Sequence, residues 1–272
     1  MSDRPSVVLG FVVHEDRDEA NSVAEKMAAQ AAGRGWATVR LAPDEQLPEG
    51  LNLLIGIGGD GTLLAAAALA LDGNLPVVGV NLGRVGYLAE IEPEMVDAML
   101  DGIAARSLEE TTRMTIEVTA EDGRRWVGVN EIVVEKLESR RLVQIKVEID
   151  DRYFTTYRAD GIITATPLGS TAYSLSAGGP VIDPALDALI VTPVAPHSLL
   201  SRSIVLAPET AIRYTVELDR PVRVNVDGRE AAEFQSGEAV TVAAGPRRIR
   251  FLSLGAHPFP QAVRSQFGLD HA

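Results

Sequence analysis

The chain has 272 residues, with 38 acidic against 25 basic side chains and a formal net charge of −13. This acid excess argues against nucleic acid and against an anionic membrane as partners, because both bind basic protein faces. Hydrophobic residues make up 46% and cysteine is absent, so the chain can bury sizeable cores but forms no disulfide and no thiolate metal site.

The apolar run at residues 7–13 is too short to span a membrane, and acidic residues flank it. It also lacks the basic n-region and the small-residue cleavage site of a signal peptide. We therefore expect no membrane partner and a cytoplasmic location.

The first hundred residues alternate strand and helix patterns. Short apolar runs separated by helical stripes are typical of βαβ units, and they predict a Rossmann-like α/β domain with a parallel sheet. The expected strands are 7–13, 37–41, 51–57 and 76–80, and the expected helices are 18–32, 62–71 and 94–105.

Beyond Arg106 the pattern changes to many short strands with few helices, which predicts an antiparallel, β-sandwich-like domain. The charge density changes at the same place, since residues 1–105 hold 16 acids and 6 bases. These two signals predict domains at 1–105 and 106–250, with a C-terminal arm at 251–272. The expected strands are 115–119, 125–129, 142–149, 152–157, 162–166, 204–207, 212–218, 222–226, 239–242 and 248–252, and Asp150-Asp151 is a hairpin-turn candidate.

A glycine-rich turn, Gly58-Gly59-Asp60-Gly61-Thr62, links a buried strand to a helix. Open α/β sheets bind ligands at such turns, and the free N–H groups of the helix attract anions. We expect the glycines to take positive φ and to let a phosphate approach the backbone. Because a phosphate cradle alone has no use for a carboxylate, Asp60 indicates a Mg²⁺ contact or a group that orients an attacking hydroxyl. The alternative is an Asp-Gly turn in which Asp60 caps the helix.

A second glycine loop, residues 81–87, follows the next strand and contains Arg84. It either completes a nucleotide site, with Arg84 near phosphates, or serves as a glycine-rich connection between the domains.

Two polar stretches mark the second half of the chain. Asn130-Glu131 interrupts an apolar strand pattern, and this pair suits ribose hydroxyls or a carboxamide as well as a purely structural role. Residues 167–180 form a turn rich in Gly, Ser and Thr. Tyr173 in this turn suits stacking on a nucleobase, and Asp160, which precedes the turn in the sequence, suits accepting a hydrogen bond from an exocyclic amine. The structural alternative is that the turn is a flexible connection.

Together and in this order, residues 58–62, Asn130-Glu131 and 169–180 resemble the NAD kinases, which phosphorylate the adenosine 2′-hydroxyl of NAD. The resemblance covers almost the whole chain. It implies an N-terminal α/β domain, a β-rich C-terminal domain, an interdomain site, a divalent metal such as Mg²⁺, ATP or polyphosphate as donor, and a homodimer or homotetramer.

The resemblance also implies a role for each candidate site residue. Asp60 is implied to accept the proton of the 2′-hydroxyl and is the candidate metal contact, with Gly61 at a phosphate. The other implied nucleotide-binding residues are Gly58, Gly59, Thr62, Asn130, Glu131, Arg141, Arg158, Asp160, Thr171, Ala172, Tyr173, Ser174, Leu175, Ser176 and Asp227. One departure is Ala65, where many relatives have an arginine.

Three other functions compete with this interpretation. The glycine motif is shared with diacylglycerol and sphingosine kinases, so a lipid kinase is one alternative. A non-catalytic NAD-binding regulator is another, against which the intact Asp60 argues. A dehydrogenase is disfavoured because the first strand-to-helix turn holds Gly10 alone rather than Gly-x-Gly-x-x-Gly.

The charge distribution sharpens the kinase prediction. The acidic half of the chain carries Asp60, and the glycine turn has no lysine. Phosphates there must be held by backbone N–H groups, a divalent cation and a few arginines. We therefore expect nearly complete dependence on a metal.

Overall fold

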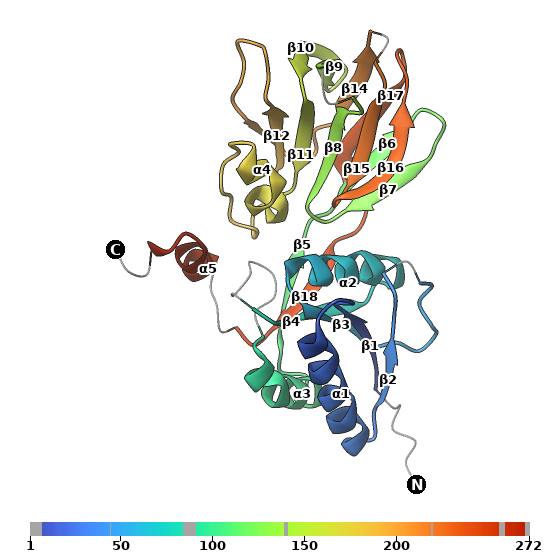
Figure 1. The fold of residues 1–272 in the computed structure, drawn as a ribbon, viewed down its shortest axis with the longest axis vertical. Coiled ribbons are helices and arrows are strands. Elements are labelled where there is room, and N and C mark those ends of the chain that lie inside the picture. Colours follow the sequence, from blue (N-terminus) through green and yellow to red (C-terminus); the bar gives the residue numbers. More distant parts are fainter. Residues whose placement is uncertain are drawn as a thin grey trace. The chain divides into compact units, whose positions relative to one another are not determined.

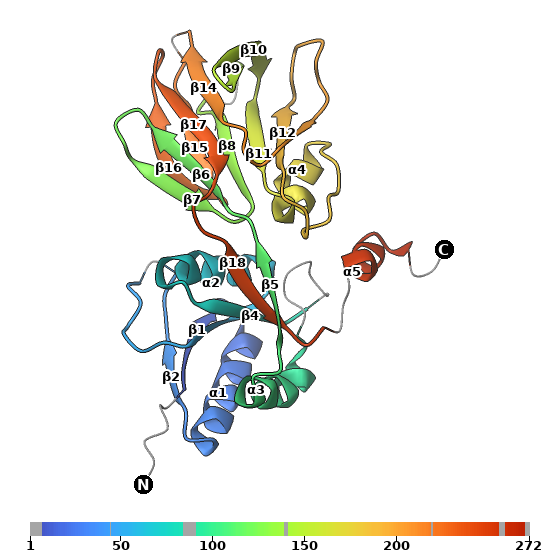
Figure 2. The same ribbon diagram turned by 180° about the vertical axis from the view of Figure 1, so that it is seen from behind.

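The computed structural model describes residues 7–43, 45–83, 91–138, 141–218, 220–255 and 259–269. The chain forms two compact units, the first comprising residues 1–112 and 249–272 and the second residues 113–248. Figures 1 and 2 show the two units from opposite sides. Among the described residues, none of the helices combines the length and apolarity that a membrane span needs.

A six-stranded sheet in the order β2-β1-β3-β4-β18-β5 forms the centre of the first unit (Figure 1). Strands β1 to β4 pair in parallel, which confirms the predicted Rossmann-like arrangement. The elements are β1 (Val8–Val13), α1 (Asp18–Gly33), β2 (Ala37–Arg40), β3 (Leu53–Gly58), α2 (Asp60–Gly73), β4 (Pro76–Asn81), the 3₁₀ turn η1 (Pro93–Met95), α3 (Val96–Ala105), β5 (Glu109–Arg113), β18 (Ile249–Ser253) and α5 (Phe259–Gln266).

Helices cover both faces of this sheet. On one face, Met27 of α1 and Met99 of α3 pack against Ile55 of β3 and its neighbours. On the other face, α2 lies so close to β3 that a Cβ on Gly56 would come within 2.8 Å of Leu63 Cα. Because β3 is buried on both faces, its sequence is apolar throughout rather than alternating.

Strand β18 corrects the sequence prediction, which assigned residues 248–252 to the β-rich half. It pairs in parallel with β4, with Arg250 opposite Pro76, and therefore belongs to the first unit. Local residue pattern shows that a segment is a strand but not which distant strand it pairs with. Strand β5 was not predicted because its sequence, Glu-Glu-Thr-Thr-Arg, is polar at the edge of the sheet.

The second unit contains two six-stranded sheets, in the orders β10-β9-β14-β17-β6-β7 and β13-β12-β11-β8-β15-β16. The pairings are antiparallel, as predicted, and inward side chains such as Ile145, Tyr214, Ile132 and Val224 share one core. The strands are β6 (Ile116–Ala120), β7 (Arg125–Gly128), β8 (Glu131–Lys136), β9 (Val143–Ile149), β10 (Arg152–Ala159), β11 (Gly161–Ala165), β12 (Leu189–Val194), β13 (Ile204–Leu206), β14 (Ile212–Glu217), β15 (Val222–Val226), β16 (Arg229–Phe234) and β17 (Ala239–Ala244), with a 3₁₀ turn η2 (Leu168–Thr171) and the short α4 (Tyr173–Ser176) after β11.

The predicted hairpin between β9 and β10 is confirmed. Asp150 and Asp151 have φ angles of 48° and 60°, and Ile149 faces Arg152 across the turn. Two successive residues with positive φ form the turn type whose twist matches that of the flanking strands. Strand β12 was not predicted because Pro193 interrupts its pattern. The proline is tolerated since β13 pairs with β12 only as far as Val191, which leaves Pro193 on an open edge.

Candidate active site

The glycine turn of the first unit joins β3 directly to α2. Gly59 is the N-cap residue of α2, and its carbonyl oxygen accepts hydrogen bonds from the N–H groups of Thr62 (3.0 Å) and Leu63 (3.1 Å). Asp60 therefore stands in the first helical turn and does not cap the helix, contrary to the structural alternative. A negative charge at this position interacts favourably with the helix dipole.

The surroundings of the glycines in this turn differ. A Cβ on Gly58 would lie 2.4 Å from Thr62 Oγ1, so this position must lack a side chain. A Cβ on Gly59 or Gly61 would meet none of the described residues within 4 Å, so none of them covers the backbone there. The expectation of positive φ was wrong for all three, and Gly59 has φ −108°. Position 58 requires glycine because of close packing and not because of a left-handed backbone conformation.

Three strand ends meet around this turn. The N–H of Leu82, just after β4, donates to the Gly58 carbonyl oxygen at 2.8 Å. Arg17, just after β1, donates from Nη1 to the Leu82 carbonyl oxygen at 2.7 Å. The start of the second glycine loop thus lies beside the first. Arg84 and the rest of that loop, residues 84–87, lie outside the described residues.

In the second unit, the Asp227 carboxylate organises the Asn130-Glu131 segment. Its two oxygens accept hydrogen bonds from three successive backbone N–H groups, those of Val129 (2.7 Å), Asn130 (2.8 Å) and Glu131 (3.0 Å). Asp227 itself has φ 48°, in the tight turn between β15 and β16. A carboxylate that binds three consecutive N–H groups fixes the course of that backbone segment.

The same segment is held from its other side by the turn that follows β11. Thr166 donates from its N–H to the Asn130 carbonyl oxygen and from Oγ1 to the Val129 carbonyl oxygen, both at 2.8 Å. A Cβ on Gly169 would lie 2.2 Å from the Asn130 carbonyl oxygen, so only glycine fits there. Tertiary structure thus joins Asn130-Glu131, Asp227 and the turn at 167–176, which are far apart in the sequence.

Glu131 lies in an unusual electrostatic environment. Its side chain is buried, and loss of solvation raises the pKa of its carboxyl group to about 8, with a smaller contribution from the negative charge of Asp227. Burial also raises the pKa of Asp227, against the effect of its three N–H donors. Within the described structure, Glu131 Oε2 and Asn130 Oδ1 are buried without a hydrogen-bond partner. Such atoms suit the hydroxyl groups of a ligand.

We expect Glu131→Gln to flatten the pH dependence of stability. Between the ordinary pKa of 4.5 and the folded value of about 8, folded Glu131 keeps a proton that the unfolded chain releases. Stability therefore falls as pH rises through this window, by up to about 5 kcal/mol. Urea unfolding at pH 5 and pH 8 should show this loss in the wild type and little of it in the variant. Exposed Glu209, changed to glutamine, is the control and should behave as the wild type.

A pocket of about 270 Å³ brings Asp160 and Tyr173 together in the second unit. It is lined by Glu135, Lys136, Leu137, Asp160, Gly161, Tyr173 and Val194. Asp160 Oδ1 accepts a hydrogen bond from Lys136 Nζ at 2.5 Å, and the Tyr173 side chain is 40% exposed. An exposed ring beside a carboxylate suits a flat, hydrogen-bonding ligand such as a nucleobase.

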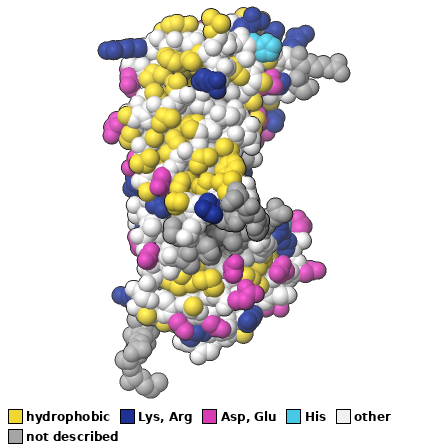
Figure 3. Space-filling model, turned by 90° about the vertical axis from the view of Figure 1, so that its left-hand side faces the viewer, with side chains coloured by type: hydrophobic (Ala, Val, Ile, Leu, Met, Phe, Trp, Pro, Cys, Tyr) yellow, Lys and Arg dark blue, Asp and Glu magenta, His cyan; other side chains and the backbone are white. Residues whose placement is uncertain are grey.

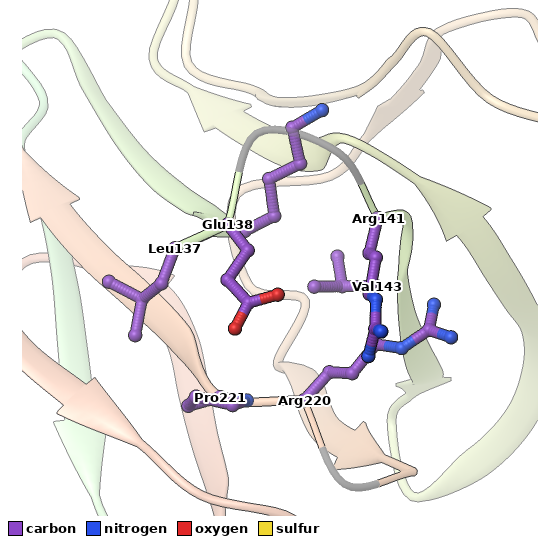
Figure 4. A pocket seen from close by; sticks show the side chains of 7 residues that line it. Leu137, Glu138, Arg141, Val143, Arg220 and Pro221 are labelled. Atoms are coloured by element: carbon purple, nitrogen blue, oxygen red, sulfur yellow. The ribbon is translucent and has the colours of Figure 1, made fainter.

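The two predicted arginines do not line this pocket. Arg141 lines a neighbouring pocket of about 40 Å³ together with Glu138 and Arg220 (Figure 4), and the two pockets share Lys136 and Leu137. Arg158 is exposed on β10, where its carbonyl oxygen accepts the His197 N–H.

Within the predicted Thr171–Ser176 segment, the side chains have different surroundings. Tyr173 and Ser176 are exposed, Thr171, Ala172 and Leu175 are partly buried, and Ser174 is fully buried. Ser174 Oγ lies 3.1 Å from Thr192 Oγ1, which in turn bonds Ser203 Oγ at 2.8 Å. Neither Thr166 nor Thr192 was among the site residues predicted from the sequence. Thr166 directly follows the apolar strand β11 and Thr192 lies within β12, so the local pattern predicts a strand but no partner for either hydroxyl group.

The described residues contain no cluster of three or more His, Asp or Glu side chains that could hold a metal. A single carboxylate at the N-terminus of α2, next to open backbone, fits Mg²⁺ that arrives with phosphates, because Mg²⁺ often binds through one or two carboxylates plus substrate phosphates. Asp60 is the residue in position for this.

Comparisons with known proteins assign both units of the chain to the same family. Residues 15–108 match the family model for the ATP-NAD kinase N-terminal domain, and residues 129–254 match that for the ATP-NAD kinase C-terminal domain. An NAD kinase of Mycobacterium tuberculosis is 35% identical, with 99% of this chain and 97% of the relative covered. An NAD kinase of Heliobacterium modesticaldum is 36% identical, with 95% and 97% covered.

Solved structures support the fold. Yeast NADH kinase complexed with NADH superposes with a TM-score of 0.84 at 20% identity, covering 99% of this chain and 90% of the yeast chain. An NAD kinase from Archaeoglobus fulgidus in complex with ATP gives a TM-score of 0.74 at 23% identity, covering 97% of each chain.

Proposed function

Because the chain belongs to the ATP-NAD kinase family, we propose that it transfers the γ-phosphoryl group of ATP to the adenosine 2′-hydroxyl of NAD. The products are NADP and ADP, and the hydroxyl proton is released. The observation that carries this proposal is the position of Asp60. Its carboxylate lies at the start of α2, beside the backbone of Gly59 and Gly61, which none of the described residues covers.

Phosphoryl transfer depends mainly on positioning and on stabilising charge, because its transition state is loose. In the proposed mechanism Asp60 orients the 2′-hydroxyl and accepts its proton as the O–P bond forms. The N–H groups at the start of α2 and the glycine turn bind phosphate oxygens. Asp60 would hold Mg²⁺ together with the phosphates, and the ion would supply positive charge that offsets the developing negative charge.

For the acceptor, we propose that the second unit recognises NAD. The partnerless oxygens of Asn130 and Glu131 hold ribose hydroxyls, and Asp227 keeps both residues in place. The pocket of Asp160 and Tyr173 takes a base or the carboxamide. Arg141, Arg158, Thr171, Ala172, Ser174, Leu175 and Ser176 remain predicted binding residues on the strength of the family pattern.

The proposal is tested by incubating the protein with NAD, ATP and Mg²⁺ and detecting NADP enzymatically. NADP should form, and excess EDTA should abolish its formation, because the described residues offer one carboxylate but no lysine at the glycine turn. Polyphosphate in place of ATP, and diacylglycerol in place of NAD, are the parallel arms. Phosphorylation of diacylglycerol alone would support the lipid kinase, and full activity in EDTA would contradict the metal requirement.

We also propose that the protein acts in the cytoplasm as a homodimer or homotetramer. Figure 3 shows hydrophobic side chains gathered on one face of the molecule. Large exposed apolar side chains flank β12 in the second unit, among them Leu186, Leu199 and Val205. Such surfaces are typical of proteins that associate.

A further inference from the structure

The glycine turn has no basic residue of its own. No lysine or arginine occurs between Arg40 and Arg84, a segment that includes β3, the turn and all of α2 and β4. A triphosphate bound at this turn nevertheless carries several negative charges next to Asp60. Backbone N–H groups neutralise only part of them. A basic side chain from another element would add to the neutralisation that backbone N–H groups and Mg²⁺ would provide there.

Arg17 reaches across this edge of the sheet. It follows β1, yet its guanidinium group bonds the Leu82 carbonyl oxygen just after β4 (2.7 Å). Strand β3 lies between β1 and β4 in the sheet. The side chain must therefore pass over the carboxyl end of β3, where the glycine turn begins.

A chain of hydrogen bonds links Arg17 to the turn itself. The Leu82 carbonyl oxygen accepts from Arg17, and the Leu82 N–H donates to the Gly58 carbonyl oxygen at 2.8 Å. A Cβ on Gly83 would lie 3.8 Å from Arg17 Nη1. The guanidinium group therefore lies beside Leu82 and Gly83, and Leu82 is in turn hydrogen-bonded to Gly58. None of the described residues fills the space over Gly59 and Gly61.

Arg17 retains donors for a ligand. A guanidinium group has five N–H donors, of which the described structure uses one, on Leu82. Among the described residues it forms no ion pair, although acidic residues adjoin it in the sequence at Asp16 and Asp18. By contrast, Arg34 at the other end of α1 is paired with Asp101 at 2.6 Å.

We propose that Arg17 binds the phosphate groups of the donor nucleotide at the glycine turn. This inference rests on the proposed function, because it assigns a residue to the donor side of that site. The planar guanidinium group suits phosphate oxygens, which it binds through paired, charge-assisted hydrogen bonds.

A purely structural role, in which Arg17 only ties α1 to β4, makes different predictions. If Arg17 has only this structural role, its loss lowers folding stability and changes the KM values for ATP and NAD alike. If Arg17 binds phosphate, its loss changes the KM for ATP but not that for NAD, and a substitute with a positive charge restores part of the binding. The variants Arg17→Gln and Arg17→Lys separate these roles, because glutamine keeps an N–H donor without the charge and lysine keeps the charge.

The test compares both variants with the wild type in steady-state kinetics. For Arg17→Gln we expect the KM for ATP to rise about 10- to 100-fold, as for one lost charge-assisted hydrogen bond, with the KM for NAD within about twofold. The inhibition constant of inorganic tripolyphosphate should rise by a similar factor. Arg17→Lys should recover part of both effects, and Arg34→Gln, on the same helix, should leave them unchanged.

The inference is overturned if Arg17→Gln leaves the KM for ATP and the tripolyphosphate inhibition unchanged. It is also overturned if both KM values change together with a lowered Tm, because that is the behaviour of a tether. Failure of the proposed function looks different, since the wild type itself would then form no NADP. Thermal unfolding of each variant shows whether the fold is retained.

Discussion

Replacing Asp60 with asparagine is expected to lower the rate of NADP formation about a thousandfold, with the protein still folded. The amide has the same shape as the carboxylate but cannot take the proton of the 2′-hydroxyl, and loss of such a group typically costs 10²- to 10⁴-fold. Asparagine also binds Mg²⁺ more weakly because it is neutral. The measurement is kcat at saturating NAD and ATP, with Tm as the check on folding.

Asp72 provides the matched control for this prediction. It lies exposed near the other end of the same helix, α2, so Asp72→Asn makes the same chemical change away from the glycine turn. We expect this variant to keep nearly all activity. Equal rates for Asp60→Asn and the wild type would contradict the kinase mechanism and would favour a role for Asp60 in structure alone.

Removing the Asp227 carboxylate is expected to have the largest effect on stability. In Asp227→Ala, three backbone N–H groups between Val129 and Glu131 lose their acceptors. Each buried donor left unpaired costs about 1–3 kcal/mol, and water entering the site recovers part, so we expect a loss of about 3 kcal/mol. The KM for NAD should rise at least about tenfold, because Asn130 and Glu131 are no longer held, while the KM for ATP changes little.

Two further variants make this prediction specific. Asp227→Asn should rescue only part of the loss, because its amide group turns a donor toward one of the three N–H groups. Asp122 also accepts a backbone N–H, that of Arg124 at 3.0 Å, but in an exposed turn of the same unit. Asp122→Ala should therefore cost less than about 1 kcal/mol in urea unfolding. An equally small loss for Asp227→Ala would refute the positioning role.

Local sequence predicted much of the fold for identifiable reasons. The unbroken apolar run of β3 predicted a strand buried on both faces, and Asp150-Asp151 predicted a tight hairpin. Both depend on interactions within a few residues. The pairing of β18 with β4 joins residues more than 170 positions apart, and no local pattern records such a choice of partner.

Some features of the candidate site were likewise predictable from the local sequence, and others were not. The order of the motifs was enough to predict an NAD kinase. The local glycine and helix signals placed Asp60 in the turn before a helix expected at 62–71, whereas α2 already begins at Asp60. The raised pKa of Glu131 was not predictable, because it follows from burial and from Asp227, which lies 96 residues further along the chain. Only tertiary structure sets how much water a carboxyl group loses.

The sequence by itself therefore determined most of the elements, the family and the residue types that phosphoryl transfer needs. Tertiary structure alone decided which side chains support them, with Asp227 under Asn130-Glu131 and Arg17 across the end of β3. The physical reason is that hydrogen bonds and desolvation act over a few ångströms in space. Residues that meet at those distances can lie anywhere in the chain.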